Sequence, residues 1–277
     1  MEKTMASMLN TVKRAVPMPV KQALRRAVYR LRNRHFRPYI KVKNIEGVAF
    51  EFWIGDCDGR DWYDLKCTDP VWIEMRFIRD HLITQGDVVF ECGGHHGCTA
   101  ILMSNWVGAA GKVVTFEPLP ANCDIIEKNI RQNGLTNVRL ERKAVGARRG
   151  IITINDVSNS SVRMSGKGVE VQATCLDDYE NLNPTFLKID VEGFEAHILQ
   201  GAKRILSTRP KLDIEIHTNL LSQYGTPVPD LLRLIDVENY KLWIQWEDNQ
   251  EPEEYDRNTP IDGRVHLFGI PLGSKPV

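Results

Sequence analysis

A cluster of glycines near the middle of the chain is the first candidate for chemistry. The apolar run 88–92, which contains Glu91, is followed by the letters GGHHG at 93–97. Glycines at such a turn let a ligand approach the backbone without a Cβ in the way. The spacing differs from G-x-G-x-x-G, and the sequence has no G-x-x-x-x-G-K-[ST] motif. The pattern therefore disfavours a dinucleotide enzyme and an ATP or GTP phosphate site.

A second candidate, Glu117, ends the next apolar run at 112–116 and is followed by Pro118. A carboxylate at the end of a strand in an α/β sheet can accept hydrogen bonds from both ribose hydroxyls of a nucleoside. It can also cap the following helix, with Pro118 in the first turn. The two interpretations are compatible, and together with the glycine-rich turn they favour a nucleoside-containing ligand.

Two later segments place acidic groups and a histidine at the same expected edge. Asp190 and Glu192 follow the apolar run 186–189, and the run 212–216 includes Glu215 and leads to His217. Alternation along a strand sends Glu215 and His217 to the same side. We predict that Asp190 binds or orients a hydroxyl acceptor and that His217 takes its proton, with Glu192 and Glu215 as second choices. Helix capping by the carboxylates and a structural role for the histidine stay open.

Two sets of these side chains could bind a metal. The first has zinc-binding side chains, but strand alternation and helix entry would turn them in divergent directions: Cys92, His95, His96 and Cys98. The second could hold a divalent cation that acidifies a hydroxyl: Asp190, Glu192 and Glu215. The pattern favours the second set and leaves metal dependence open.

The elements that must position these residues alternate in type. Short apolar runs predict strands at 87–92, 112–116, 138–144, 186–189, 212–216 and 265–270. Amphipathic patterns predict helices at 70–82, 98–107, 121–132, 194–206 and 228–237. Buried strands separated by helices predict an α/β, Rossmann-like fold with a mostly parallel central sheet and helices on both faces. A hairpin of 151–154 with 169–173 is expected as an insertion at about 150–175.

We divide the chain into a basic helical arm at 1–45, an extension at 46–85 and a ligand-binding domain at 86–277. The arm carries twelve Lys and Arg residues and one acid, Glu2. Pro17 and Pro19 are expected to separate two short helices in it. Its apolar stripe could pack on the body or on a second subunit, giving a homodimer. Alternatively, the arm could attach to an anionic membrane surface or polymer.

Composition indicates the cellular location of the protein and the redox state of its cysteines. The sequence has no apolar run long enough for a transmembrane helix and no signal-peptide pattern, so we expect a cytoplasmic protein, with the arm as a route to the inner membrane surface. Its six cysteines have no C-x-x-C pair and no framework spacing, so we expect reduced thiols.

Taken in order, the motifs of about residues 85–220 resemble those of the FkbM-type methyltransferases. The matching segments are Gly93–Gly97, Phe116–Pro118, Asn133–Val138, Ala144–Gly146, Leu176–Asp178, Lys188–Gly193 and Ile214–His217. The resemblance implies a class I S-adenosylmethionine (SAM) fold and O-methylation of a sugar, glycan or polyketide-like hydroxyl. It also implies a set of cofactor-binding residues: Glu91, Gly93, Gly94, His95, Gly97, Glu117, Pro118 and Ala144.

Two other classes of function stay open. The sequence departs from the family pattern in three places. Glu91 and Cys92 stand where the family usually has Asp-Val, His95 replaces a usual Asn, and Ala147 replaces a frequent Asp. These departures leave open a binding or scaffold protein that keeps the fold and has lost catalysis. A nucleic-acid methyltransferase would use the arm to follow phosphates, but the body is acidic and lacks an N-P-P-Y-like motif. The acceptor pocket is expected to involve the arm, 46–65, 155–168 and 247–262.

Overall fold

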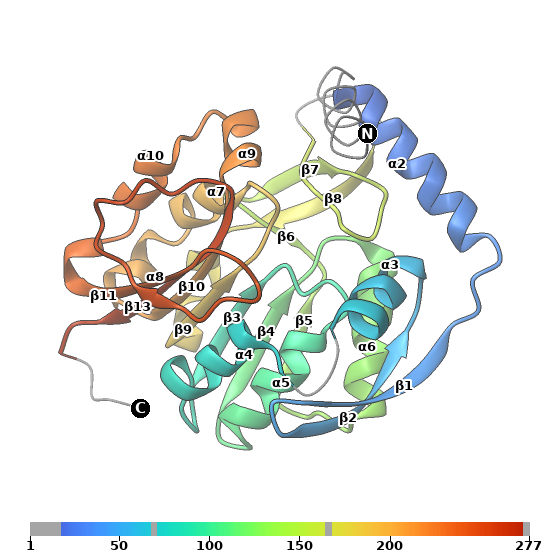
Figure 1. Ribbon diagram of the computed structural model, residues 1–277, viewed down its shortest axis with the longest axis horizontal. Coiled ribbons are helices and arrows are strands. Elements are labelled where there is room, and N and C mark those ends of the chain that lie inside the picture. The colour runs from blue at the N-terminus through green and yellow to red at the C-terminus, as the bar shows by residue number, and fades with distance from the viewer. Residues whose placement is uncertain (1–17, 68–70, 164–167, 274–277) are drawn as a thin grey trace, which may run out of the picture.

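The computed structural model describes residues 18–67, 71–163 and 168–273. At its centre, eight strands form one sheet: β3 (Val88–Cys92), β4 (Lys112–Phe116), β5 (Val138–Glu141), β9 (Phe186–Ile189), β10 (Lys211–His217), β11 (Tyr240–Gln245), β12 (Glu253–Glu254) and β13 (Arg264–Pro271). Their order across the sheet is β12-β11-β13-β10-β9-β3-β4-β5 (Figure 1).

The arrangement of these strands creates a ligand-binding edge. Strands β10, β9, β3, β4 and β5 run parallel, whereas β13 and β11 continue the sheet in antiparallel fashion. The chain order reverses at β3, which has β4 on one side and β9 on the other. Open α/β sheets bind ligands at the carboxyl edge beside such a reversal. The predicted α/β class with a mostly parallel sheet is confirmed.

Helices cover both faces of the sheet because its inner strands are apolar on both sides. Val89 and Val113 pack on one face, and Phe90 and Val114 pack on the other. The helices are α4 (Ile73–Phe77), α5 (Cys98–Val107), α6 (Pro120–Gln132), α7 (Glu195–Gln200), α8 (Lys203–Ser207), α9 (Thr218–Leu221) and α10 (Val228–Arg233). The first face contains the core beside α5, and the second contains the core beside α7 and α8.

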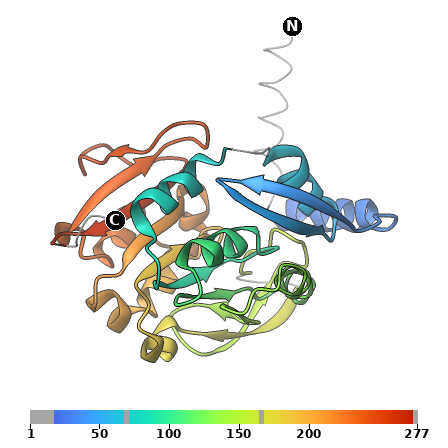
Figure 2. The ribbon, with the colours of Figure 1, turned by 90° about the horizontal axis from the view of Figure 1, so that it is seen from below.

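Two smaller sheets flank the large one. The hairpin of β1 (Tyr39–Ile45) and β2 (Val48–Ile54) lies beside α6 (Figure 2). A three-stranded sheet pairs β8 (Val169–Thr174) with β7 (Gly150–Ile154) and with β6 (Ala144–Val145). The antiparallel pairing of β7 and β8 confirms the predicted inserted hairpin.

Several predicted elements are shorter or divided in the structure. The strand expected at 138–144 turns at Arg142, where the Lys143 amide donates to the Glu141 carbonyl, so that β5 and β6 join different sheets. The helix expected at 194–206 is interrupted at Gly201, where a Cβ would lie 2.2 Å from the Gly146 carbonyl oxygen. The helix expected at 228–237 ends at Arg233, and β11 was not predicted.

The N-terminal arm contributes one described helix, α2 (Met18–Asn33), and the first of its two expected helices lies outside the described residues. α2 is followed by the β1–β2 hairpin, then α3 (Cys57–Gly59) and a π-helical segment, Arg60–Lys66. Within the described part of the chain, none of the helices combines the length and the apolar character that crossing a bilayer requires.

Candidate active site

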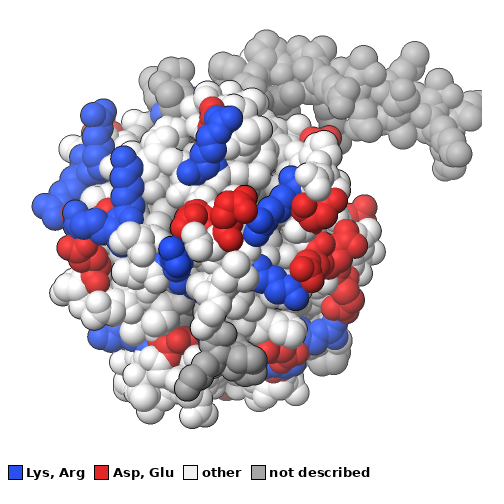
Figure 3. Space-filling view, turned by 90° about the vertical axis from the view of Figure 1, so that its left-hand side faces the viewer, with Lys and Arg blue, Asp and Glu red and all other residues white. Residues whose placement is uncertain are grey.

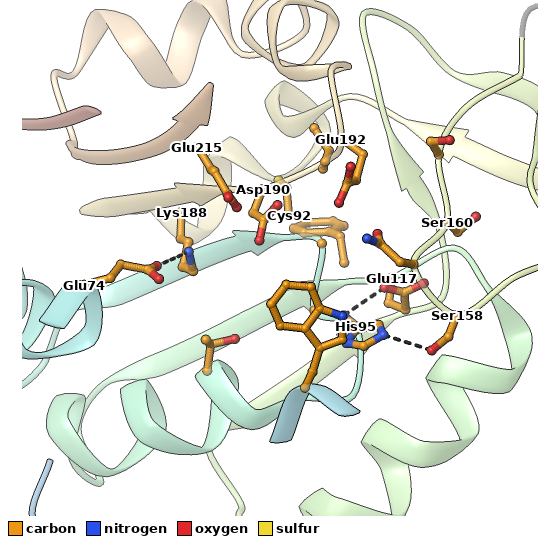
Figure 4. Close-up of a pocket in the computed structure, with 18 of the residues that line it drawn as sticks. Glu74, Cys92, His95, Glu117, Ser158, Ser160, Lys188, Asp190, Glu192 and Glu215 are labelled. Carbon is orange, nitrogen blue, oxygen red and sulfur yellow. Dashed lines mark hydrogen bonds and ion pairs between the residues drawn. The ribbon is translucent and has the colours of Figure 1, made fainter. Parts of the chain in front are cut away.

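A cavity of about 720 Å³ lies over the carboxyl edge of the sheet. Side chains from the glycine-rich turn, β4, β9 and β10 converge on it (Figure 4). Eight of the predicted cofactor-binding and catalytic residues line it: Gly93, Gly94, His95, Glu117, Pro118, Ala144, Asp190 and Glu192. Glu215, predicted as a metal ligand, lines it as well. The structure thus brings together most of the residues that the sequence separates.

The glycines of the turn make room for protein atoms. Gly93 has a φ of 97°, and a Cβ there would lie 1.9 Å from the Asp190 carbonyl oxygen. At Gly94, a Cβ would lie 2.2 Å from the Thr115 hydroxyl oxygen. The sequence interpretation placed a ligand in this space. The structure uses it to hold the turn after β3 against the loop after β9, and both glycines also line the cavity.

The next residue, His95, lies in a strained and buried position. Its φ is 48°, in the left-handed region that non-glycine residues rarely adopt. The ring Nδ1 is 2.8 Å from the Tyr63 hydroxyl, and Nε2 is 2.9 Å from the Ser158 hydroxyl. Burial lowers the pKa of His95 to about 3, so the imidazole is neutral. Two flanking segments therefore fix this turn residue from both ends of its ring.

Glu117 accepts hydrogen bonds from the backbone around it. The His95 amide donates to Oε2 at 2.9 Å, and the Leu119 amide donates to Oε1 at 2.9 Å. Burial raises the pKa of Glu117 to about 7, even though these donors favour the carboxylate. Oε1 also accepts from the Asn122 side-chain amide at 3.3 Å, so Glu117 caps the following turn and keeps the second lone pair of Oε2 as an acceptor for the cavity. Both predicted interpretations of this residue are compatible with that geometry.

Asp190 and Glu215 face each other across the ends of β9 and β10. Burial and the nearby charge of Asp190 raise the pKa of Glu215. Burial alone would also raise the pKa of Asp190, but a hydrogen bond from Glu215 offsets this effect, and the pKa of Asp190 is lowered. Two close carboxyl groups that are withdrawn from water share a proton in this way. The pair thus presents one carboxylate, on Asp190, to the cavity.

Behind this pair, Lys188 is buried in a network of charges. Its Nζ is 2.6 Å from Glu74 Oε1 and 3.0 Å from Asp213 Oδ2, and His266 Nδ1 is 3.1 Å from Asp213 Oδ1. Although burial opposes it, the carboxylates of Glu74 and Asp213 raise the pKa of His266 to about 10. Two cations, Lys188 and His266, thus balance two buried carboxylates, Glu74 and Asp213, behind the Asp190–Glu215 pair.

Three predicted site residues lie outside the cavity lining. Glu91 is buried in β3, where Thr99 donates to its carboxylate, and Gly97 begins α5 against Ile126. His217 is also buried, with Nδ1 at 2.8 Å from Glu195 Oε1. Burial lowers the pKa of His217, but Glu195 and the other nearby carboxylates raise it overall. A buried ring that does not line the cavity is poorly placed to act as the predicted base.

The second possible base, Glu192, reaches the cavity from the loop after β9. Its φ of 55° places another non-glycine residue in the left-handed region. Its Oε2 is 3.9 Å from His217 Nε2, so His217 links the Glu195 side of the loop to Glu192. His217 is therefore placed to position Glu192.

Neither predicted metal set is assembled as expected among the described residues. Cys92 and Cys98 pack in the two cores on opposite faces of the sheet, and the stacked rings of His95 and His96 point to Ser158. The zinc alternative is therefore wrong.

For the acidic set, ligand atoms of Asp190, Glu215 and His217 lie within 4.8 Å of one another, and Glu192 is not among them. Arg264 Nη1 already lies 2.9 Å from Glu215 Oε1, so a cation there would compete with a guanidinium.

The walls of the cavity come from segments outside the motifs. Three of the four regions expected to form the acceptor pocket contribute: 46–65 through Trp62 and Tyr63, 155–168 through Ser158 to Val162, and 247–262 through Asp248 and Asn249. No described residue of the arm lines this cavity. Sequence reasoning missed Glu74, Lys188 and His266. Lys188 and His266 each interrupt an apolar stretch of strand, which was the available signal, whereas Glu74 lies in a short helix that also contains Arg76.

The comparisons with known proteins add the family. A family model, the methyltransferase FkbM domain, matches residues 91–242. Among solved structures, methyltransferase FkbM from Methylobacillus flagellatus KT is 18% identical over 68% of this chain and 45% of that chain, with a TM-score of 0.46. A SAM-dependent O-methyltransferase from Thermotoga maritima is 14% identical over 85% of this chain and 79% of that chain, also with a TM-score of 0.46.

The chain thus spans less than half the length of the Methylobacillus protein. The curated proteins include no match. Because both TM-scores lie below 0.5, the assignment rests on the family model, which covers more than half of the chain.

Proposed function

This chain belongs to the FkbM methyltransferase domain family, and from that premise we propose that it transfers a methyl group from SAM to a hydroxyl group. The acceptor class that we propose is a sugar, glycan or polyketide-like molecule. One observation carries the proposal: a single cavity joins the nucleoside-type features at Glu117 to the proton-sharing pair of Asp190 and Glu215.

The residues beside Glu117 fit a nucleoside. Glu117 offers the second lone pair of its Oε2 to a ribose hydroxyl. Phe116, Pro118, Ala144 and Val145 line the same cavity and offer apolar surface for a base. When bound, SAM supplies an electrophilic methyl group on a sulfonium. The task left to the protein is to hold the acceptor in line with it, which is worth about 7–11 kcal/mol of the barrier.

Asp190 is our proposed catalytic base. An alcohol becomes a good nucleophile as its proton leaves, and the carboxylate of Asp190 faces the cavity where that proton would be released. Glu215 fixes the orientation of Asp190 through its hydrogen bond. Glu192, held near His217, is placed to bind another hydroxyl of a polyol acceptor. This assignment moves the predicted base from His217 to Asp190.

The first test is calorimetric titration of SAM and its demethylated product into the wild type, Glu117→Ala and the control Glu127→Ala. Glu127 lies on α6, the helix that follows Glu117, and pairs with Arg142 at the surface. We expect micromolar binding by the wild type and the control, and a large loss in Glu117→Ala with an unchanged fold by circular dichroism. No binding by folded wild type would contradict the cofactor assignment.

The second test is turnover with labelled SAM and a panel of hydroxyl acceptors. Transfer to sugars, glycans or polyketide-like alcohols supports the proposal. Binding of SAM without transfer to any acceptor, including nucleic acid, would favour the scaffold alternative. Transfer to RNA or DNA alone would replace the proposed acceptor class.

A further inference from the structure

The helix α2 lies at the edge of the molecule and leads into the β1–β2 hairpin (Figures 1 and 2). It touches the body through polar side chains. The Tyr29 hydroxyl donates to Asp56 at 2.7 Å, and the Cys57 amide donates to Asn33 Oδ1 at 2.8 Å. The inner face of this amphipathic helix is thus its hydrogen-bonding face.

The outer face of α2 carries an apolar stripe. Its members follow the spacing of one helix face, and their exposed fractions are 54% for Val20, 64% for Leu24, 46% for Val28 and 70% for Leu31. Surface helices of globular proteins turn such a stripe toward the core. In α2 the orientation is reversed, and water would be the neighbour of the stripe unless another surface covers it.

The charges around the stripe point to the kind of surface. Six arginines occur between residues 25 and 37, and no acid occurs between Glu2 and Glu46. Arg30 and Arg32 pair with acids of the body, Asp156 and Asp61, and so hold the helix in place. By contrast, on the C-terminal face of the molecule basic and acidic side chains are interspersed (Figure 3). A basic helix with an exposed apolar stripe is the pattern of peptides that lie in an anionic membrane interface.

We propose that α2 docks this protein on an anionic lipid surface. The stripe Val20-Leu24-Val28-Leu31 enters the boundary between headgroups and acyl chains, and exposed arginines outside the pairs with the body, Arg34 and Arg37, meet lipid phosphates. A second copy of the chain fits less well, because two such helices would bring basic side chains together. The proposal does not depend on the identity of the methyl acceptor.

The test is co-sedimentation of the full-length protein with lipid vesicles. One set contains phosphatidylcholine alone, and the other contains phosphatidylcholine with phosphatidylglycerol. The stripe variant is Leu24→Gln/Leu31→Gln. The matched control is Ile151→Gln, which changes an equally exposed apolar residue on β7. Because all three residues are at the surface, thermal melting should be unchanged.

We expect binding to the anionic vesicles only, with a partition coefficient about tenfold or more lower in the stripe variant than in the control. Three results would overturn the proposal. The first is no binding of the wild type to anionic vesicles. The second is equal binding by the stripe variant, which would mean adsorption by charge alone. The third is a dimer by light scattering that the stripe variant converts to a monomer.

Discussion

The two sides of the cavity are built in different ways. On the glycine-rich side, nearby backbone amides of His95 and Leu119 donate to Glu117 across 22 and 2 positions, although Tyr63 and Ser158 hold the His95 ring from farther along the chain. The acidic side depends on distant partners, since Lys188 pairs with Glu74 across 114 positions. Local backbone geometry therefore shapes the first side, and charge balance across the whole fold shapes the second. The four predictions below test that contrast.

The largest expected effect is on turnover. Asp190→Asn removes the proposed base, and kcat should fall about 10²- to 10⁴-fold. SAM affinity should change little, because Glu117 and the turn are untouched. The control is Asp262→Asn, at an exposed position near the end of β10. A fall in SAM affinity equal to the fall in kcat would mean that the two sides are not separable.

Breaking the buried network should mainly affect stability. Lys188→Met leaves Glu74 and Asp213 without their ammonium partner, and removing one member of a buried ion pair costs about 3–5 kcal/mol. Urea unfolding would measure the loss. Lys241→Met, which removes a pair with Glu254 at the surface, should cost less than about 1 kcal/mol. Similar losses in the two variants would refute a special role for the network.

Substituting Gly93 tests the contact between the two sides. Gly47→Ala changes a glycine with a φ of 81° and open space around it, so strain alone should cost about 1–2 kcal/mol. Gly93→Ala adds a clash with the Asp190 backbone, and overpacking adds about 1–3 kcal/mol. Gly93→Ala should also reduce kcat, because it displaces the loop that carries Asp190. Unfolding and turnover measured on both variants would show whether the clash matters.

The smallest effect concerns pH and SAM binding. The pKa of Glu117 in the free protein is about 7, because burial raises it. If ribose hydroxyls donate to its carboxylate, binding favours the ionised form and affinity rises with pH up to that pKa. The dissociation constant should be about tenfold higher at pH 6 than at pH 8. Calorimetry across this range on the wild type and Glu117→Gln would decide, and an unchanged slope in the variant would exclude Glu117.

The contrast also explains which residues of the site could be predicted from the sequence. Glu117 and the glycine-rich turn were found because each is a local pattern of strand, turn and helix. Alternation placed Glu215 and His217 on one side of β10, but it does not show which of the two side chains lines the cavity. Glu215 reaches the cavity, whereas His217 turns to Glu195 on α7. The cavity lining therefore favours Asp190, which follows β9, over His217 at the end of β10 as the base that we propose.

Other residues escaped because their partners are remote. Glu74 lies on α4 and His266 on β13, and neither sequence neighbourhood indicates that the two meet around Lys188. The unpredicted β11 is a different case, since Tyr240, Leu242 and Ile244 alternate with less buried residues as a strand should. The helix at 194–206 was divided by Gly201, whose contact with Gly146 is a tertiary feature.

The buried charge network around Lys188 limits where this protein can be truncated. The family match at 91–242 contains Lys188 and Asp213, but it omits Glu74 and His266. It also omits β13, which lies between β10 and β11 in the sheet. A fragment trimmed to those borders would leave an open gap in the sheet and a buried ammonium with half of its counter-ions. The unit recognised in sequence is smaller than the unit that folds, and the flanks can diverge to suit new acceptors only while they continue to supply these missing parts.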